Sequence, residues 1–178
     1  AAWAAREKKA SSMHAGMGLI RDGQADAFVS AGNTGGVLAV ATLHTLKRIR
    51  GVKRPALAAI LPLPAGHFVT LDIGANADCR PEYLVQFAVM GSVYARAVLG
   101  LSDPRVALLS NGEERGKGNQ LVKETTKLLE TSSLSFVGNV EPKEAMACSA
   151  DVVVHDGFTG NVFIKTTEAA AGMLTDLI

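Results

Sequence analysis

Aromatic residues are scarce in this chain of 178 residues, and neither sign of charge dominates it. Only 5% of the residues are aromatic, whereas 48% are hydrophobic, so any core must be built mainly from aliphatic side chains. The net charge of +1 provides no bulk attraction to nucleic acid. We therefore expect no nucleic-acid partner, and any anion site must be local.

Cysteines and long apolar runs are also few. Cys79 and Cys148 form neither a C-x-x-C pair nor a spacing suited to zinc, so we expect reduced thiols in a cytoplasmic protein. No apolar run approaches the roughly 20 residues that a membrane span needs. Residues 1–9 lack the apolar stretch of a signal peptide. The four histidines are scattered and build no cluster with cysteine or carboxylate, so we expect no metal.

The hydrophobic pattern alternates between two periods along the chain. Short apolar runs predict strands at 26–30, 56–61, 67–72, 105–110, 134–137 and 150–155. Capped or amphipathic segments predict helices at 11–21, 34–47, 81–99, 119–131, 142–147 and from 161 onward. This alternation predicts an α/β fold with a largely parallel sheet and helices on both faces. No linker divides the chain, so one α/β domain over residues 1–178 is expected.

Small turns rich in Gly and Asn follow five of the predicted strands, at 30–35, 72–76, 110–114, 138–141 and 156–161. In a parallel sheet such turns meet at the carboxyl edge, where open α/β sheets bind ligands. Helix N-termini beyond the turns direct N–H groups toward the same space, which suits phosphate or an oxyanion. One such turn alone is ordinary turn chemistry, but the recurrence favours a shared site.

Two nucleotide-binding motifs fail on spacing. Residues 112–118 place three residues between the first two glycines where a P-loop has four, and Gly118 stands where the P-loop has Ser or Thr. Residues 32–36 do not form G-x-G-x-x-G. Ser30 and Ser110 end predicted strands without a nucleophile elbow. Among the histidines, only His155 is expected near the site.

Several motifs, in this order, resemble phosphate acyltransferases of the PlsX type: Ser-Ala-Gly-Asn-Thr-Gly at 30–35, Leu-Asp-Ile-Gly-Ala-Asn at 71–76, and the segments 84–94, 112–119, 136–141 and 151–161 with Lys165. The resemblance runs from about Ser11 to the last residue. It implies a three-layer α/β/α sandwich of the isocitrate/isopropylmalate dehydrogenase type, usually homodimeric. It also implies a soluble enzyme that associates peripherally with the membrane.

The resemblance implies a reaction as well. Family members convert acyl-acyl carrier protein and inorganic phosphate into acyl phosphate for phospholipid synthesis. Such acyl transfer needs oriented phosphate and oxyanion donors but no cofactor. Family members open with a strand and an Asp-x-Met-Gly-Gly-Asp loop and continue past residue 178. We therefore expect an internal portion of a longer protein, much weakened or inactive alone.

Three alternatives remain open at this point. One is a short-chain phosphate acetyl- or butyryltransferase that uses coenzyme A. Another is a dehydrogenase of the related fold, although no dinucleotide motif supports it. The third is a non-catalytic module that binds acyl chains or carrier protein.

Helix 81–99 is apolar on more than one face, which is typical either of deep core or of a self-association surface.

The expected catalytic residues are Asn33, Asn76 and Asn161, assisted by Lys165. Asn161 is expected to open the last helix, with Lys165 one turn later on the same face. The plainer alternative is that Asn161 only caps that helix and Lys165 only reaches solvent. The remaining residues expected to bind phosphate or substrate are Ser30, Gly32, Thr34, Gly35, Asp72, Gly74, Gly112, Glu113, Lys117, Asn119, Asn139, Asp156, Gly157 and Gly160.

Overall fold

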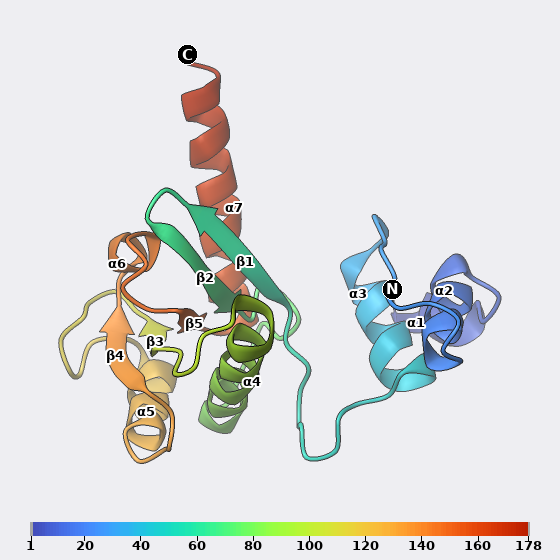
Figure 1. Cartoon of the computed structure of the whole chain (residues 1–178), viewed down its shortest axis with the longest axis horizontal. Coiled ribbons are helices and arrows are strands. Elements are labelled where there is room, and N and C mark those ends of the chain that lie inside the picture. The colour runs from blue at the N-terminus through green and yellow to red at the C-terminus, as the bar shows by residue number, and fades with distance from the viewer. Residues whose placement is uncertain (1, 178) are drawn as a thin grey trace. The chain divides into compact units, whose positions relative to one another are not determined.

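The computed structural model describes residues 2–177, with side chains from Ala5 onward. Its contacts divide the chain into two compact units, one ending at Pro55 and one beginning at Ala56. Each unit is described by itself (Figure 1). The single domain expected over residues 1–178 stays a prediction.

The first unit is helical. It contains α1 (Ala2–Glu7), α2 (Ser12–Arg21) and α3 (Thr34–Ala39), which continues into the π-helical turn η1 (Val40–Thr45). Its small core consists of Ala5, Met17, Ala39 and Val40. The helices predicted at 11–21 and 34–47 are confirmed.

The strand predicted at 26–30 is wrong. These residues are irregular, and the side chain of Val29 is 92% exposed. A strand needs a partner for its backbone N–H and C=O groups, and no other strand lies in the described part of this unit. The apolar composition of the run therefore did not suffice to make it a strand.

The second unit is built on a sheet of five strands. They are β1 (Ala58–Leu63), β2 (Gly66–Leu71), β3 (Val106–Leu109), β4 (Phe136–Val140) and β5 (Val152–Val154), in the order β1-β2-β5-β3-β4. Strand β1 runs antiparallel to β2, and all other neighbours are parallel. The β1–β2 connection is too short for a crossover, so this pair must be a hairpin.

Helices cover both faces of this sheet (Figure 1). They are α4 (Pro81–Leu99), α5 (Gln120–Leu129), α6 (Pro142–Met146) and α7 (Gly157–Thr175). Successive side chains of a strand point to opposite faces. Leu108 accordingly packs in the cluster formed with α4 and α5, whereas Leu109 packs in the cluster that includes α6 and Phe163 of α7. The predicted α/β arrangement with helices on both faces is confirmed.

Two expectations about loops and helix ends are wrong. Asn139 lies inside β4 rather than in a turn after it, because the strand continues past an irregularity in register to Val140. Helix α7 begins at Gly157, and Asp156 rather than Asn161 caps it. An aspartate side chain accepts the free N–H groups of a first helical turn, so the helix can start as soon as β5 ends.

The distal part of α7 extends past the sheet (Figure 1). None of the helices within residues 2–177 combines the length and apolar character that crossing a membrane would require.

Candidate active site

The carboxyl ends of β2, β5, β3 and β4 lie at one edge of the sheet, because these strands are parallel neighbours. The segments that follow them, at 72–76, 156–161, 110–114 and 141, therefore meet at that edge. The prediction that these four segments gather at one edge is confirmed, whereas their forming a shared site stays a prediction. The turn at 30–35 belongs to the first unit, and its place at this edge stays a prediction.

Asp72 anchors the loop after β2. Its side chain is fully buried, and one carboxylate oxygen accepts hydrogen bonds from the backbone N–H groups of Leu57 (3.0 Å), Gly74 (3.2 Å) and Ala75 (2.9 Å). The other oxygen accepts from the backbone N–H and the side-chain Nδ2 of Asn76, both at 2.8 Å. Donors that the sequence suggested for phosphate thus bind the chain's own carboxylate.

Asp156 occupies the N-terminus of α7 in a similar way. Its carboxylate accepts from the backbone N–H of Thr159 at 2.7 Å and from the Thr159 hydroxyl at 2.9 Å. The N–H of Gly157 donates to the carbonyl of Asn76 at 2.8 Å. A negative side chain is stabilised at this end of a helix. The Asp156 carboxylate and the Asn76 carbonyl thus accept from two backbone N–H groups at this helix terminus, and phosphate binding at this turn stays a prediction.

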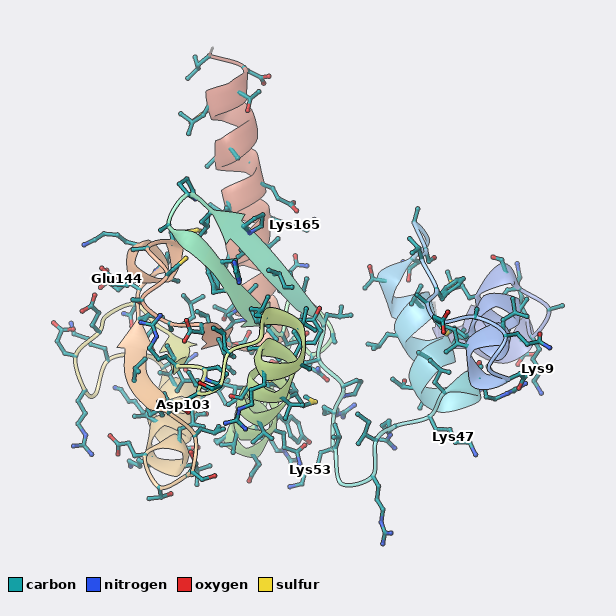
Figure 2. The ribbon with its side chains drawn as sticks, in the orientation of Figure 1. Lys9, Lys47, Lys53, Asp103, Glu144 and Lys165 are labelled. Carbon is teal, nitrogen blue, oxygen red and sulfur yellow. The ribbon has the colours of Figure 1, made fainter. Side chains whose placement is uncertain are left out.

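Asn161 lies in the second turn of α7, where its Nδ2 donates to the carbonyl of Ile73 at 3.3 Å. It therefore joins the helix to the loop after β2. Lys165, one turn further, is exposed to solvent. Figure 2 shows Lys165 on α7 well apart from Glu144 on α6.

The segment between β3 and α5 folds on itself. The side chain of Asn111 accepts from the N–H of Gly118 at 3.0 Å, and Asn119 caps α5 by accepting from Val122 N–H at 2.9 Å. Gly112 packs against the side chain of Lys117, which a Cβ at position 112 would approach to 2.7 Å. Asn119 is thus the N-cap of α5, at the start predicted for this helix.

Glu113 interacts with α6. A hydrogen bond with the Glu144 side chain raises the pKa of Glu113. Burial raises the pKa of Glu144, but hydrogen bonds that include those from Lys143 and Glu113 outweigh it, and the net shift is downward. Glu144 is therefore the carboxyl of this pair that ionises first as pH rises.

A cavity of about 1240 Å³ opens at the carboxyl edge beside α5, α6 and α7. Its polar residues include Asn111, Asn119, Asp156 and Thr159. Its apolar walls comprise Leu84, Leu109, Leu121, Val122, Pro142, Met146, Val162, Phe163, Ala170, Ala171 and Leu174. Ligand sites commonly combine such apolar walls with a few placed polar groups.

Of the predicted site residues, Asn119 and Asp156 line this cavity, whereas Asn76, Asn161 and Lys165 do not. Sequence reasoning missed Asn111 and Thr159 as site residues. Both lie inside the Gly/Asn-rich turns, so the same loop argument could have found them. The α7 wall was harder to find, because an apolar helix stripe is usually ordinary core.

Behind these loops lies His155, of which only 3% is exposed. Its Nδ1 is 3.1 Å from the carbonyl oxygens of both Asp72 and Asp156, and its Nε2 is 2.7 Å from the Thr70 hydroxyl. Burial lowers the pKa of His155, and hydrogen bonds and neighbouring carboxylates oppose this only in part. The imidazole is therefore neutral near pH 7.

Cys79 is the cysteine nearest this edge. Its Sγ lies 3.5 Å from the carbonyl oxygen of Asn76. Burial raises the pKa of its thiol to about 11. Because the thiolate is the nucleophilic form, Cys79 is not an activated nucleophile.

In the first unit, the predicted residues form a helix cap. The Ser30 hydroxyl accepts from the N–H of Gly32 at 3.0 Å, and the Asn33 side chain accepts from the N–H of Gly36 at 3.0 Å. Thr34 is the first residue of α3. Within residues 2–177 no group of three or more His, Cys, Asp or Glu side chains is placed to hold a metal ion.

Two solved structures that share this fold are a phosphotransacetylase and a phosphotransacylase. A EutD phosphotransacetylase from Staphylococcus aureus superposes with a TM-score of 0.65 at 21% identity, over 90% of this chain and 56% of that one. A branched-chain phosphotransacylase from Enterococcus faecalis gives 0.63 at 22% identity, over 90% and 65%. At such low identity these likenesses establish the fold alone.

The model of the fatty acid synthesis protein family matches residues 1–178. A "Phosphate acyltransferase" from Herpetosiphon aurantiacus is 52% identical over 176 residues, which cover 98% of this chain and 48% of the relative. One from Myxococcus xanthus is 51% identical over 100% of this chain and 52% of the relative. The chain thus belongs to the fatty acid synthesis protein family, which confirms the resemblance found in the motifs, and it spans about half the length of these relatives.

Proposed function

We propose that the protein is a phosphate acyltransferase that transfers an acyl group from acyl carrier protein to inorganic phosphate and so supplies acyl phosphate for phospholipid synthesis. The observation that carries the proposal is the 52% identity, over 98% of this chain, to a relative named Phosphate acyltransferase. That this chain is an internal portion of a longer protein stays a prediction.

The reaction is a single acyl transfer. An oxygen of phosphate attacks the thioester carbonyl carbon, so that a C–O bond forms and the C–S bond breaks. The carrier leaves as a thiolate and takes up the proton that phosphate gives up. Positioned hydrogen-bond donors lower the energy of the oxyanion that forms in between. No cofactor is required by this balance.

The cavity offers both environments that this reaction needs. Its apolar walls suit an acyl chain, and Asn111, Asn119 and Thr159 bring polar groups to the same space. We propose that these groups act together with Asn76, Asn161 and Lys165 of the same unit. A catalytic role for Asn33, which lies in the first unit, stays a prediction. Asn76 and Asn161 each donate from Nδ2 to a neighbouring carboxylate or backbone carbonyl. Because an amide NH₂ group carries two N–H donors, we propose that the second N–H of Asn161 Nδ2 would donate to the oxyanion.

The decisive experiment measures thiol release from acyl-acyl carrier protein by the full-length protein with and without inorganic phosphate. Hydroxylamine added to the reaction should trap acyl phosphate as a hydroxamate. Release that needs phosphate and prefers acyl carrier protein over acyl-coenzyme A supports the proposal. Preference for short acyl-coenzyme A donors would instead indicate a phosphate acetyl- or butyryltransferase. Acyl-chain binding without turnover would indicate a binding module.

The remaining proposals concern fold type, assembly and location. We propose the three-layer α/β/α sandwich of the isocitrate/isopropylmalate dehydrogenase type, a homodimer, and a cytoplasmic protein in peripheral contact with the membrane. Support for the dimer comes from α4, where Val89 and Val93, one helical turn apart, are 46% and 57% exposed. Adjacent exposed apolar side chains favour association. Sedimentation of the full-length protein as a monomer at all concentrations would contradict the dimer.

A further inference from the structure

We propose that His155 is a positioning residue, held in one neutral tautomer by Thr70, that sets the loop 72–76 against the first turn of α7. Its effect on turnover rests on the proposed acyl transfer, whereas its effect on the loops does not.

The hydrogen-bond partners assign the tautomer. Nδ1 of His155 faces two backbone carbonyl oxygens, those of Asp72 and Asp156, each at 3.1 Å. A carbonyl oxygen can only accept, so Nδ1 must carry the proton and shares it between them. In the neutral ring Nε2 is then an acceptor, and the Thr70 hydroxyl at 2.7 Å donates to it. All three contacts agree on one proton arrangement.

Packing leaves the ring one position. His155 is 3% exposed and Thr70 is fully buried. The imidazole and the Phe163 ring meet edge to face, with ring centroids 6.4 Å apart. A Cβ at position 160 would collide with the imidazole and with the carbonyl oxygen of Asp72. Gly160 therefore lets the first turn of α7 lie directly on the ring, and the ring cannot turn over without displacing the helix.

The ring continues the β2–β5 ladder beyond the strand ends. Within the ladder the N–H of His155 donates to Leu71 at 3.0 Å, and the N–H of Asp72 donates to His155 at 3.1 Å. Past the ladder, the imidazole binds the carbonyl of Asp72 while the side chain of Asp72 binds the N–H groups of residues 74–76. Asp72 thus accepts a hydrogen bond from the imidazole through its backbone carbonyl, and its carboxylate binds the N–H groups of the loop.

The other carbonyl on the ring belongs to Asp156, whose side chain caps α7 and lines the cavity. A shift of His155 therefore moves two elements of the carboxyl edge together. Misplacement of reacting groups by about 1 Å can cost on the order of a hundredfold in rate. Loss of the hydrogen bond between the Thr70 hydroxyl and Nε2 of His155 should accordingly lower the turnover rate.

The test compares Thr70→Val with Thr70→Ser in the full-length protein. Valine keeps the shape but removes the hydroxyl that donates to Nε2, whereas serine retains it. Thr125→Val is the matched control, because Thr125 is also fully buried but its hydroxyl donates within its own helix, to Leu121 at 2.7 Å. Imidazole ¹⁵N chemical shifts report the tautomer, and steady-state kinetics report kcat and the KM for phosphate.

We expect Thr70→Val to mix the tautomers and to lower kcat by about tenfold or more. Thr70→Ser should keep the single tautomer and most of kcat, and Thr125→Val should lower the Tm without changing kcat. If Thr70→Val lowers the Tm as Thr125→Val does but leaves tautomer and kcat unchanged, His155 has a structural role only and the proposal is overturned.

A second pair of variants keeps the proposal testable without turnover. His155→Asn places an amide N–H close to the position of Nδ1, whereas His155→Phe keeps a ring and removes both nitrogens. Amide hydrogen exchange at Gly74, Ala75 and Gly157 should speed up at least tenfold in His155→Phe and less in His155→Asn. If the wild type shows no phosphate-dependent transfer, the proposed function fails while this measurement still decides the role of His155. Should His155→Phe not fold, the ¹⁵N shifts of Thr70→Val and Thr70→Ser decide whether His155 positions the loops. Amide exchange rates in Thr70→Val equal to those in Thr125→Val would then overturn the proposal.

Discussion

Replacing Asp72 by asparagine should destabilise the second unit more than any other isosteric change at this edge. The buried carboxylate accepts five hydrogen bonds, three on one oxygen and two on the other. An amide group supplies only one acceptor oxygen, and its NH₂ group would face N–H donors. If the amide oxygen keeps the side with three donors, the two bonds from Asn76 are lost.

The magnitude follows from those two bonds. A hydrogen bond to a charged group contributes about 1.5–3 kcal/mol, so the expected loss is roughly 3–6 kcal/mol. For a unit of this size such a loss corresponds to a fall in Tm of roughly 10–20 °C. The loop 72–76 should loosen with it, and proposed acyl transfer should fall.

Urea unfolding followed by circular dichroism measures this change as a lower midpoint at an unchanged slope. Asp78→Asn is the matched control, because Asp78 is exposed in the same loop region and its replacement should stay within about 0.5 kcal/mol. A loss below about 1 kcal/mol for Asp72→Asn would refute the view that this carboxylate organises the loop.

Four further predictions concern α7 and His155. Gly160→Ala should destabilise the protein through collision with His155, whereas Gly172→Ala, which meets nothing within 4 Å, should be neutral or stabilising; both are measured as midpoint shifts. Asn161→Ala should lower the free energy of unfolding by about 1 kcal/mol through its lost hydrogen bond, and a rate loss of a hundredfold or more would assign Asn161 an oxyanion role. Lys165→Met should weaken only the dependence of turnover on phosphate. Normal turnover of both variants at saturating phosphate would show that this segment has a structural role only. Because burial lowers the pKa of His155 in the folded state, its stabilising contribution is present above the unfolded pKa of about 6.5 and is lost as pH falls through the folded value. Tm measured from pH 8 to pH 5 should therefore fall less steeply in His155→Asn than in the wild type.

Local signals explain which elements could be predicted from the sequence. Helix 81–99 was predicted with the bounds that α4 has, because Pro81 suits the first helical position. In the structure Gly100, with φ of 70°, ends this helix in a left-handed conformation. The strand at 26–30 failed for the opposite reason. A strand is a property of a pair, and an apolar run carries no information about whether a partner exists.

The loops after the strands were found, but their hydrogen bonds were not. Gly/Asn-rich turns indicate N–H groups that can bind an anion. Whether that anion is a substrate or the chain's own side chain depends on which carboxylate lies nearby. In the structure Asp72 and Asp156 accept hydrogen bonds from donors at two of these turns. Phosphate binding by the residues of these turns stays a prediction.

The sequence by itself determined the alternation of strands and helices, the Gly/Asn turns that follow the strands, and the family to which the chain belongs, since each depends on neighbours in the chain or on motifs read in order. The tertiary structure alone decided that Asp72 anchors its loop and that His155 joins two loops through Thr70. These features depend on groups as many as 85 residues apart in the chain. Only the folded sheet brings them within hydrogen-bonding distance.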